Sequence, residues 1–269
     1  MALKNYRPIT ATRRHTVKID YIKDNIWRGP SFKKLSFGMK KTGGRNNSGS
    51  ISSFHRGGGH KRSFRKIDFL REILDIPAIV YRIEYDPNRS SYIALIVYKT
   101  GIIKYIIAVE GIKIGSIILF TRHNNININI GNAMPLNQIP IGSKIHNVES
   151  HPYAGASLIR AAGTFSKLIK RDEEKATIRL RSKKEIIISS NCLASIGIVS
   201  KMDYKNLKGG KAGHSRHSGN RPVVRGVAMN PVDHPHGGGE GKTSGGRVSV
   251  TPWARPTKGY KTKRKQTKK

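Results

Sequence analysis

The sequence has one cysteine, few acidic residues and no long apolar run, and each shortage excludes a class of protein. A single cysteine, Cys192, excludes a disulfide framework within the chain and any zinc site built from several cysteines. We interpret Cys192 as a small core residue beside a strand. The most apolar stretch, 102–120, is interrupted by Lys104, Glu110 and Lys113, so it predicts short strands and no membrane span.

The shortage of acidic residues leaves a large excess of positive charge. The chain has 51 Lys plus Arg against 16 Asp plus Glu, a formal net charge of +35. Such a chain repels itself unless a polyanion neutralises it, which favours nucleic acid over an acidic membrane surface as the partner. Residues 1–66 carry 17 basic and 2 acidic residues, residues 67–200 carry 17 and 11, and residues 201–269 carry 17 and 3. The charge therefore predicts a folded middle between two flanks that meet phosphate.

The middle of the chain predicts two small antiparallel β barrels. Short runs rich in β-branched and aromatic residues alternate there with turn residues. We expect Tyr81, Tyr85, Tyr92 and Tyr98 to pack in the first barrel, with base stacking as the alternative, and we interpret the Asn- and Ile-rich run 124–130 as an insertion or drift in the linker between the barrels. The expected strands are 79–85, 92–98 and 102–108 in the first barrel, and 144–148, 157–161, 164–169, 177–180 and 185–189 in the second.

The N-terminal flank has little to bury. Its apolar anchors are few beyond Trp27, Phe32, Leu35 and Phe37, too few to offset the entropy of ordering residues 1–66 alone. We therefore expect this flank to fold on its partner.

Two features of the flanks are typical of RNA contact. In RGGGHKR (56–62), glycines between basic residues let guanidinium and backbone N–H groups converge on phosphates; a flexible, solvated linker is the alternative interpretation. After residue 200 regular structure fades. There Trp253 follows a proline in a basic tail with no core nearby, which makes it a candidate to stack on a base.

The segment GVAMNPVDHPHGGGEG (226–241) is the most unusual stretch of the chain. It holds two prolines and five glycines around Asp233, His234 and His236, so it can form neither a regular helix nor an inner strand. Consecutive glycines permit positive φ and close approach of the backbone to another surface. We predict an irregular loop that is held by a large, rigid partner.

Other chemistry can be read into this loop. Before Gly241, Lys242 and Thr243, a phosphate-binding P-loop needs a glycine where His236 stands, and no strand precedes it, so we set an NTPase aside. Asp233, His234 and His236 could bind a metal or act directly in chemistry, but no further Cys or His cluster completes a structural zinc site. A loop embedded in RNA remains the favoured interpretation, and these two stay as alternatives.

Seven segments, in this order, resemble the universal large-subunit ribosomal protein two family. They are RGGGHKR (56–62), KIDF (66–69), EYDPNR (84–89), GNAMPL (131–136), IHNVE (145–149), RAAG (160–163) and RPVVRG (221–226), which runs into the loop. The resemblance extends from Met1 to about Lys265. This sequence departs from the family pattern at Ser50 and Phe54, where arginine is frequent, and at His217, where an aromatic residue is common.

The resemblance implies an all-β fold and a non-enzymatic role. It implies an OB-fold barrel at 67–125 and an SH3-like barrel at 126–200, between long, basic, irregular extensions at 1–66 and 201–269. The implied partners are large-subunit rRNA, other ribosomal proteins, the small subunit at the intersubunit interface and nearby tRNA, with no membrane. No cofactor is implied beyond Mg²⁺ associated with the rRNA, and no metal site.

The implied role is to support subunit assembly and association, tRNA binding and the peptidyl-transferase region. Asp233, His234 and His236 are the candidates nearest that region, as support and not as catalysts. The expected rRNA-binding residues are Arg45, Arg56, Gly57, Gly58, Gly59, His60, Lys61, Arg62, Arg65, Lys66, Lys211, Arg216, Arg221, Arg225, Asn230, Gly237, Gly238, Gly239, Lys242, Arg247, Trp253 and Arg255.

Composition and local resemblance also bear on origin. Heavy use of Ile, Asn and Lys, and similarity of both ends to the alphaproteobacterial and mitochondrion-encoded branch, favour a protein made in a mitochondrion; a bacterial cytoplasm or a plastid is the alternative. Since the resemblance begins at Met1, we expect no added import peptide. Two rival functions stay open at this point. One is an RNA-metabolism enzyme that uses the segment 226–241 with His234 and His236, which we call the His loop; the other is a non-ribosomal chaperone or DNA-compacting protein.

Overall fold

The computed structural model describes residues 3–22, 24–124, 126–241 and 243–261. Its contacts divide the chain into two units, each built from two separate segments. The barrel unit comprises Met1–Lys41 and His60–His214, and the arm unit comprises Thr42–Gly59 and Ser215–Lys269. Among the described residues, no helix has the length and apolar character needed to cross a membrane.

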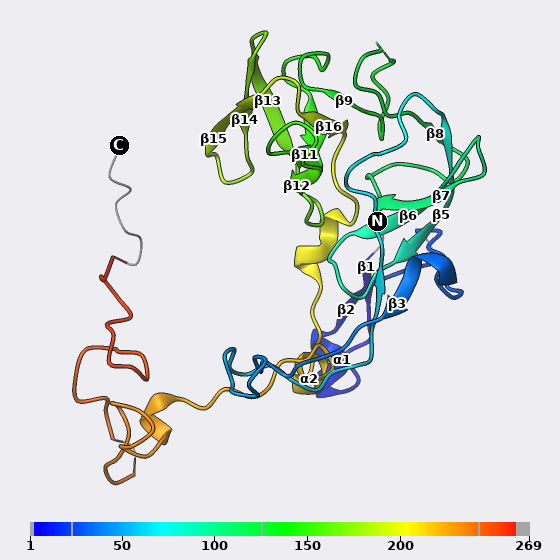
Figure 1. Cartoon of the computed structure of the whole chain (residues 1–269). Coiled ribbons are helices and arrows are strands. Elements are labelled where there is room, and N and C mark those ends of the chain that lie inside the picture. The colour runs from blue at the N-terminus through cyan, green and yellow to red at the C-terminus, as the bar shows by residue number, and fades with distance from the viewer. Residues whose placement is uncertain (1–2, 23, 125, 242, 262–269) are drawn as a thin grey trace. The chain divides into compact units, whose positions relative to one another are not determined.

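The first sheet of the barrel unit contains the strands expected at 79–85, 92–98 and 102–108. It is antiparallel with the order β7-β6-β5-β8. The four strands are labelled in Figure 1. Alternation of buried and exposed side chains along β5 places one face of the sheet on a core that includes Val80, Ile96, Ile106 and Phe120. The strands are β5 (Ala78–Tyr85), β6 (Tyr92–Tyr98), β7 (Ile103–Ile107) and β8 (Ile117–Ile118).

The second sheet has six strands in the order β15-β14-β13-β10-β16-β9, and β11 pairs with β12 beside it. Its core includes Leu136, Ile145 and Ile178, together with Cys192, which is fully buried beside β16 as predicted. The strands are β9 (Ala133–Pro135), β10 (Lys144–His146), β11 (Val148–Glu149), β12 (Ala156–Leu158), β13 (Ser166–Arg171), β14 (Lys175–Arg179), β15 (Glu185–Ser189) and β16 (Leu193–Ile196). The all-β fold, an OB-fold barrel followed by an SH3-like barrel, is confirmed.

Several strands of the second barrel differ from the expected ones. The strand expected at 144–148 is broken at Asn147, whose φ of 48° lies in the left-handed region, and the one expected at 157–161 ends before Ile159, with a φ of 56°. Strands β9 and β16 were not predicted. Each is short, and β9 ends in Pro135, which a pattern of strand formers does not reveal.

Two of the four tyrosines expected to pack in the first barrel are exposed on its strand β5. Tyr92 and Tyr98 are buried, but Tyr81 and Tyr85 are 61% and 44% exposed. Tyr81 lies at the register shift between Val80 and Arg82, where the alternation along β5 is interrupted, and Tyr85 is the last residue of the strand, where its ring meets that of Tyr21. The prediction is therefore wrong for Tyr81 and Tyr85.

The N-terminal segment packs on the barrel. Ile19 and Ile26 are buried, and Phe32 and Leu35 pack against Ile93, Leu95 and Tyr105. The expectation that this flank orders only on a partner therefore does not hold for the described part of 3–41. Its elements are β1 (Leu3–Asn5), α1 (Ala11–His15), β2 (Val17–Ile19), the 3-10 helix η1 (Lys33–Leu35) and β3 (Ser36–Gly38), which pairs with β4 (Ser63–Arg65).

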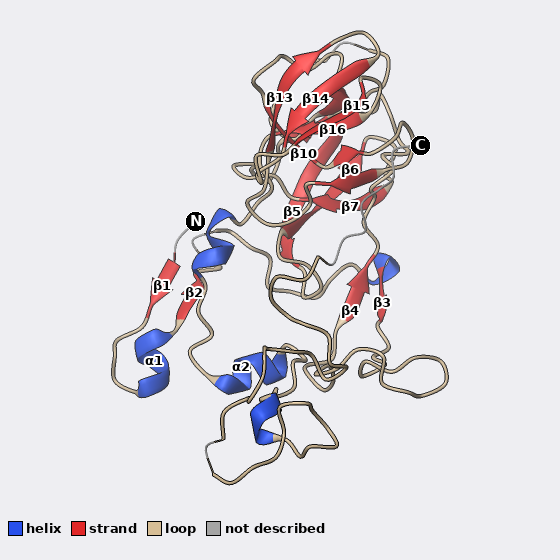
Figure 2. Cartoon of the chain, turned by 90° about the vertical axis from the view of Figure 1, so that its left-hand side faces the viewer, coloured by secondary structure: helices blue, strands red, loops and turns tan. Residues whose placement is uncertain are grey.

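Little regular structure follows the barrels. The described elements are η2 (Met202–Asn206), α2 (Ala212–His217) and η3 (Gly226–Ala228), and the segments of the arm unit are drawn almost entirely as loop (Figure 2). The predicted loss of regular structure after residue 200 is confirmed.

Candidate nucleic-acid interface

The arm unit joins two basic stretches that lie far apart in the sequence. The Gly57 N–H donates to the Gly219 carbonyl at 3.0 Å, and the Arg221 N–H donates to the His55 carbonyl at 2.9 Å. Gly59 has a φ of 77°, and a Cβ there would lie 2.8 Å from the Gly219 Cα. Gly59 therefore serves a close approach between two segments of this chain, in addition to any approach to RNA.

This pairing brings together positive side chains that form no ion pair with the described carboxylates. Seven arginines of the arm unit lie among the described residues, all seven are exposed, and the described residues form no ion pair with any of them. Asp233 and Glu240 are the acidic residues of its sequence. Exposed guanidinium groups without carboxylate partners are suited to phosphate oxygens. The arginines are Arg45, Arg56, Arg216, Arg221, Arg225, Arg247 and Arg255.

The His loop is organised around two stacked imidazoles. The rings of His234 and His236 lie 5.1 Å apart at an interplanar angle of 24°. The backbone N–H of His236 donates to the ring nitrogen Nδ1 of His234 at 3.0 Å. His234 is only 7% exposed, because a Cβ at Gly226 would come within 2.5 Å of its Cε1 and glycine alone leaves that space.

His236 connects this loop to the next segment of the chain. Its Nε2 accepts from the Val250 N–H at 3.0 Å, and its Nδ1 lies 3.1 Å from the Gly245 carbonyl. An imidazole nitrogen that accepts carries no proton, so Nδ1 carries the proton and donates to Gly245. Both ring nitrogens of His236 are therefore occupied by backbone partners.

The glycines of the loop are also explained by contacts inside it. A Cβ at Gly237 would lie 2.3 Å from the Asn230 carbonyl oxygen, and one at Gly238 would lie 2.7 Å from Pro231 Cγ. The Asn230 carbonyl also accepts from the N–H groups of Asp233 and His234. The loop thus has an internal frame, unlike the expected loop held only from outside.

This geometry bears on the alternative chemistry considered for the loop. Among the described residues, no three or more His, Cys, Asp or Glu side chains cluster closely enough to hold a metal ion. The occupied nitrogens of His236 leave it no free lone pair with which to accept a proton. A positioning role for the two histidines fits the observed contacts.

Trp253 lies at the tip of a short hairpin. The Thr251 N–H donates to the Arg255 carbonyl at 2.8 Å, and Val250 bridges to Pro256. The Trp253 ring is 66% exposed and lies 5.8 Å from the ring of Phe54, which comes from the other segment of the arm unit. Sequence reasoning missed Phe54, because nothing in the sequence shows that residues 54 and 253 meet.

The remaining expected rRNA-binding residues fall into two groups. The arm unit holds Gly57, Gly58, Gly59, Asn230, Gly237, Gly238 and Gly239 together with its arginines, Trp253 and the His loop. His60, Lys61, Arg62, Arg65, Lys66 and Lys211 belong to the barrel unit. Lys242 lies outside the described residues.

An all-β protein whose irregular arms carry exposed aromatic rings, and exposed arginines that no described carboxylate pairs with, has the features of a nucleic-acid-binding protein that docks on folded RNA. Comparison with known families specifies which kind. Residues 32–120 match the family model described as Ribosomal Proteins L2, RNA binding N-terminal domain, and residues 129–254 match Ribosomal Proteins L2, C-terminal domain. The chain therefore belongs to the ribosomal protein L2 family.

Individual relatives agree over the whole chain. It is similar to the large ribosomal subunit protein uL2 of Rickettsia canadensis (strain McKiel) and of Rickettsia massiliae (strain Mtu5), each 53% identical over 270 residues that cover 100% of this chain and 97% of the relative. It is also 51% identical to the large ribosomal subunit protein uL2m of Reclinomonas americana over 267 residues, 99% of this chain and 95% of the relative. The predicted family and function, a structural RNA-binding protein of the large ribosomal subunit, are confirmed, and no match supports the enzyme alternative.

Proposed function

We propose that this chain holds large-subunit rRNA through its arm unit while its two barrels dock on folded rRNA. The observation that carries the proposal is the set of seven exposed arginines to which no described carboxylate is paired. The pairing of Gly57 with Gly219 brings their two segments into one unit. RNA phosphates would supply the missing counter-charge. In this proposal rRNA is bound by the extensions 1–66 and 201–269, and within them by the rRNA-binding residues named from the sequence.

The proposal extends to the surroundings of the His loop. The loop around His234 and His236 supports the peptidyl-transferase region and nearby tRNA by its shape, and the chain assists subunit assembly and contact with the small subunit. The stacked, hydrogen-bonded imidazoles support this view, since they fix a backbone that RNA can pack against.

We assign the chain to a mitochondrial ribosome. Its similarity to the uL2m of Reclinomonas americana supports this assignment, while the similarity to Rickettsia proteins keeps a bacterial ribosome as the alternative. Fractionation of the source cells, with antibody detection of the chain beside matrix and cytosolic markers, distinguishes the two. Detection only in the cytosol of a bacterium would overturn the mitochondrial assignment.

Retention of large-subunit and small-subunit rRNA by the purified chain, measured over a range of salt concentrations, tests the function. We expect tighter retention of large-subunit rRNA and a steep loss of affinity with salt, because each neutralised phosphate releases counterions. Equal affinity for both rRNAs would remove the proposed specificity.

A further inference from the structure

A cavity of about 670 Å³ opens in the barrel unit between the paired strands β1 and β2 and the strand β5. This volume lies within the roughly 300–1,000 Å³ that is typical of small-molecule sites. Much of its wall comes from residues 4–29, which precede the matched RNA-binding domain at 32–120. Nothing in the family assignment accounts for this cavity.

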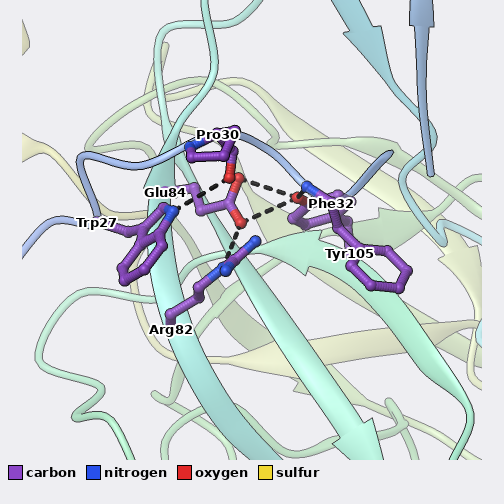
Figure 3. Close-up of polar contacts among 6 residues, drawn as sticks. All are labelled: Trp27, Pro30, Phe32, Arg82, Glu84 and Tyr105. Carbon is purple, nitrogen blue, oxygen red and sulfur yellow. Dashed lines mark hydrogen bonds and ion pairs between the residues drawn. The ribbon is translucent and has the colours of Figure 1, made fainter. Parts of the chain in front are cut away.

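One wall of the cavity is held rigidly by a polar network (Figure 3). The Trp27 indole Nε1 donates to the Pro30 carbonyl at 3.1 Å, and the guanidinium carbon of Arg82 lies 4.6 Å from the centre of the Trp27 ring. Arg82 Nε donates to Glu84 at 2.7 Å. These contacts fix the position of an indole that is still 45% exposed.

The carboxylate on this wall is fully engaged. Glu84 is 3% exposed, and the Tyr105 hydroxyl lies 2.9 Å from both of its carboxylate oxygens and donates to them. The same hydroxyl accepts from the Phe32 N–H at 2.9 Å. Because Arg82 balances the charge of Glu84, this carboxylate does little to repel an anion in the cavity.

Four cationic side chains line the cavity, and two of them face each other. In the antiparallel pair of β1 and β2, Lys4 lies directly opposite Lys18. Like charges at such positions are destabilising. Arg28 and Arg65 add to the positive charge, and the described residues form no ion pair with any of the four. An anion between Lys4 and Lys18 would turn their repulsion into attraction.

The same cavity presents aromatic surface. Tyr21 and Tyr85 meet edge to face with ring centres 6.1 Å apart, and with Trp27 they line the cavity while remaining partly exposed. Burial is the main cause that raises the pKa of both phenols, so both stay neutral at physiological pH. Neutral aromatic faces beside uncompensated cations suit a flat base that is attached to a phosphate.

We propose that this cavity binds a single unpaired nucleotide of RNA. Its phosphate lies between Lys4 and Lys18, and its base packs against Tyr21, Tyr85 and Trp27. This inference rests on the proposed rRNA-binding function and adds a site that takes one nucleotide out of a helix. Of the acidic residues that line the cavity, Asp20 is the one whose carboxylate has no described cation partner, and it accepts from the Ile22 N–H at 3.2 Å.

Tryptophan fluorescence of the full chain tests the proposal. In a Trp253→Phe background, Trp27 is the remaining tryptophan and reports on the cavity. The probes are a single-stranded adenosine hexanucleotide, a duplex RNA of equal length, and AMP. We expect the hexanucleotide to change Trp27 emission saturably and to bind at least fivefold more tightly than AMP, and the duplex to leave the emission unchanged.

Variants assign the signal to the cavity. Lys18→Gln should weaken hexanucleotide binding at least threefold and Tyr21→Ala should reduce the emission change. The matched control, Lys99→Gln, removes a charge from a turn away from the cavity and should change neither. Thermal melting of each variant shows that the fold is kept.

The contrary outcomes are distinct. Unchanged Trp27 emission with every probe, or equal binding by Lys18→Gln and Lys99→Gln, overturns the cavity proposal. AMP binding as tight as the hexanucleotide would mean a site for free mononucleotide and overturns the RNA assignment. Retention of large-subunit rRNA, measured in the same samples, separates these failures from failure of the proposed function.

Discussion

The imidazole Nε2 of His236 accepts a hydrogen bond of 3.0 Å from the backbone N–H of Val250, fourteen residues further along the chain. With the Nδ1 of the same ring on the Gly245 carbonyl, His236 ties the turn at 226–241 to the segment that carries Trp253. His236, for which the sequence left a direct chemical role open as an alternative, thus connects two segments of the arm unit by hydrogen bonds.

Replacing His236 should therefore loosen the arm unit, and any effect on peptide-bond formation should follow from that loosening. Each hydrogen bond contributes about 1 kcal/mol, so in His236→Ala we expect amide exchange at Val250 to accelerate roughly fivefold or more. In assembled particles, peptide-bond formation should slow, while the isolated chain has no turnover to lose. His151→Ala, an exposed histidine of the barrel unit, is the control. Normal particle activity together with faster exchange would remove the functional part of this prediction.

The stability of the barrel unit should fall on mild acidification. His146 is fully buried, and this burial lowers the pKa of its imidazole from 6.5 to about 4. Between pH 6.5 and 4 the unfolded chain binds a proton that the folded chain does not, so folding stability declines as pH falls through that window. A shift of this size corresponds to at most about 3 kcal/mol.

The contribution of His146 can be isolated by difference. The free energy of unfolding of the wild type should fall more steeply from pH 6.5 to 4 than that of His146→Gln, since carboxylates titrate equally in both. His151→Gln should follow the wild type. Parallel curves for the wild type and His146→Gln would show that His146 does not carry the effect.

Arginines of the arm unit should set the salt dependence of rRNA binding. Arg56→Ala or Arg225→Ala removes an exposed guanidinium group, so affinity should drop and the slope of log K against log salt should become shallower by about 1. Lys99→Ala, on a barrel turn, should leave the slope unchanged. An unchanged slope in Arg56→Ala would sink its assignment to a phosphate.

The pair of Phe54 and Trp253 should bind bases by stacking. Loss of one stacking ring costs about 1–3 kcal/mol, so Trp253→Ala should weaken rRNA retention roughly fivefold or more. Trp253→Phe keeps a flat ring and should retain most of the affinity. Phe54→Ala should give an intermediate loss, since its ring also orients Trp253. If Trp253→Phe and Trp253→Ala bind alike, stacking is not the interaction.

The Tyr105 hydroxyl should anchor the N-terminal segment to the barrel. Tyr105→Phe leaves Glu84 and the Phe32 N–H each without this partner, which should cost about 1–3 kcal/mol of folding stability. Thermal melting measures the loss, and cleavage near Phe32 by a protease should become faster. Tyr81→Phe, at an exposed ring, should melt like the wild type. Equal melting of both variants would contradict the anchoring role.

Local patterns in the sequence were sufficient to predict the three long strands of the first barrel. The runs around β5, β6 and β7 are long, β-branched and bounded by turn residues, so their type follows from nearest neighbours along the chain. The short β9 and β16 carry no such pattern. They exist because they pair with each other at Leu193 and Pro135, which are far apart in the sequence.

In the candidate site, too, some features follow from local sequence and others depend on contacts between residues far apart. Charge and glycine content were enough to select the two basic arms and the His loop. Three features depend on contacts between distant residues that no local pattern encodes: Phe54 with Trp253, His236 with Val250, and Lys4 opposite Lys18. The departure from the family at Phe54 was the one available signal, and it indicated a lost arginine, not a new aromatic contact.

The most direct test of the central claim is sedimentation of the native protein through a sucrose gradient after a high-salt wash. Each fraction is probed for this chain and for large-subunit rRNA. A protein whose arms bind rRNA should stay with the large subunit after loosely held basic proteins have left. Release into the top fractions, with the large subunit otherwise intact, would contradict the account and reopen the chaperone interpretation.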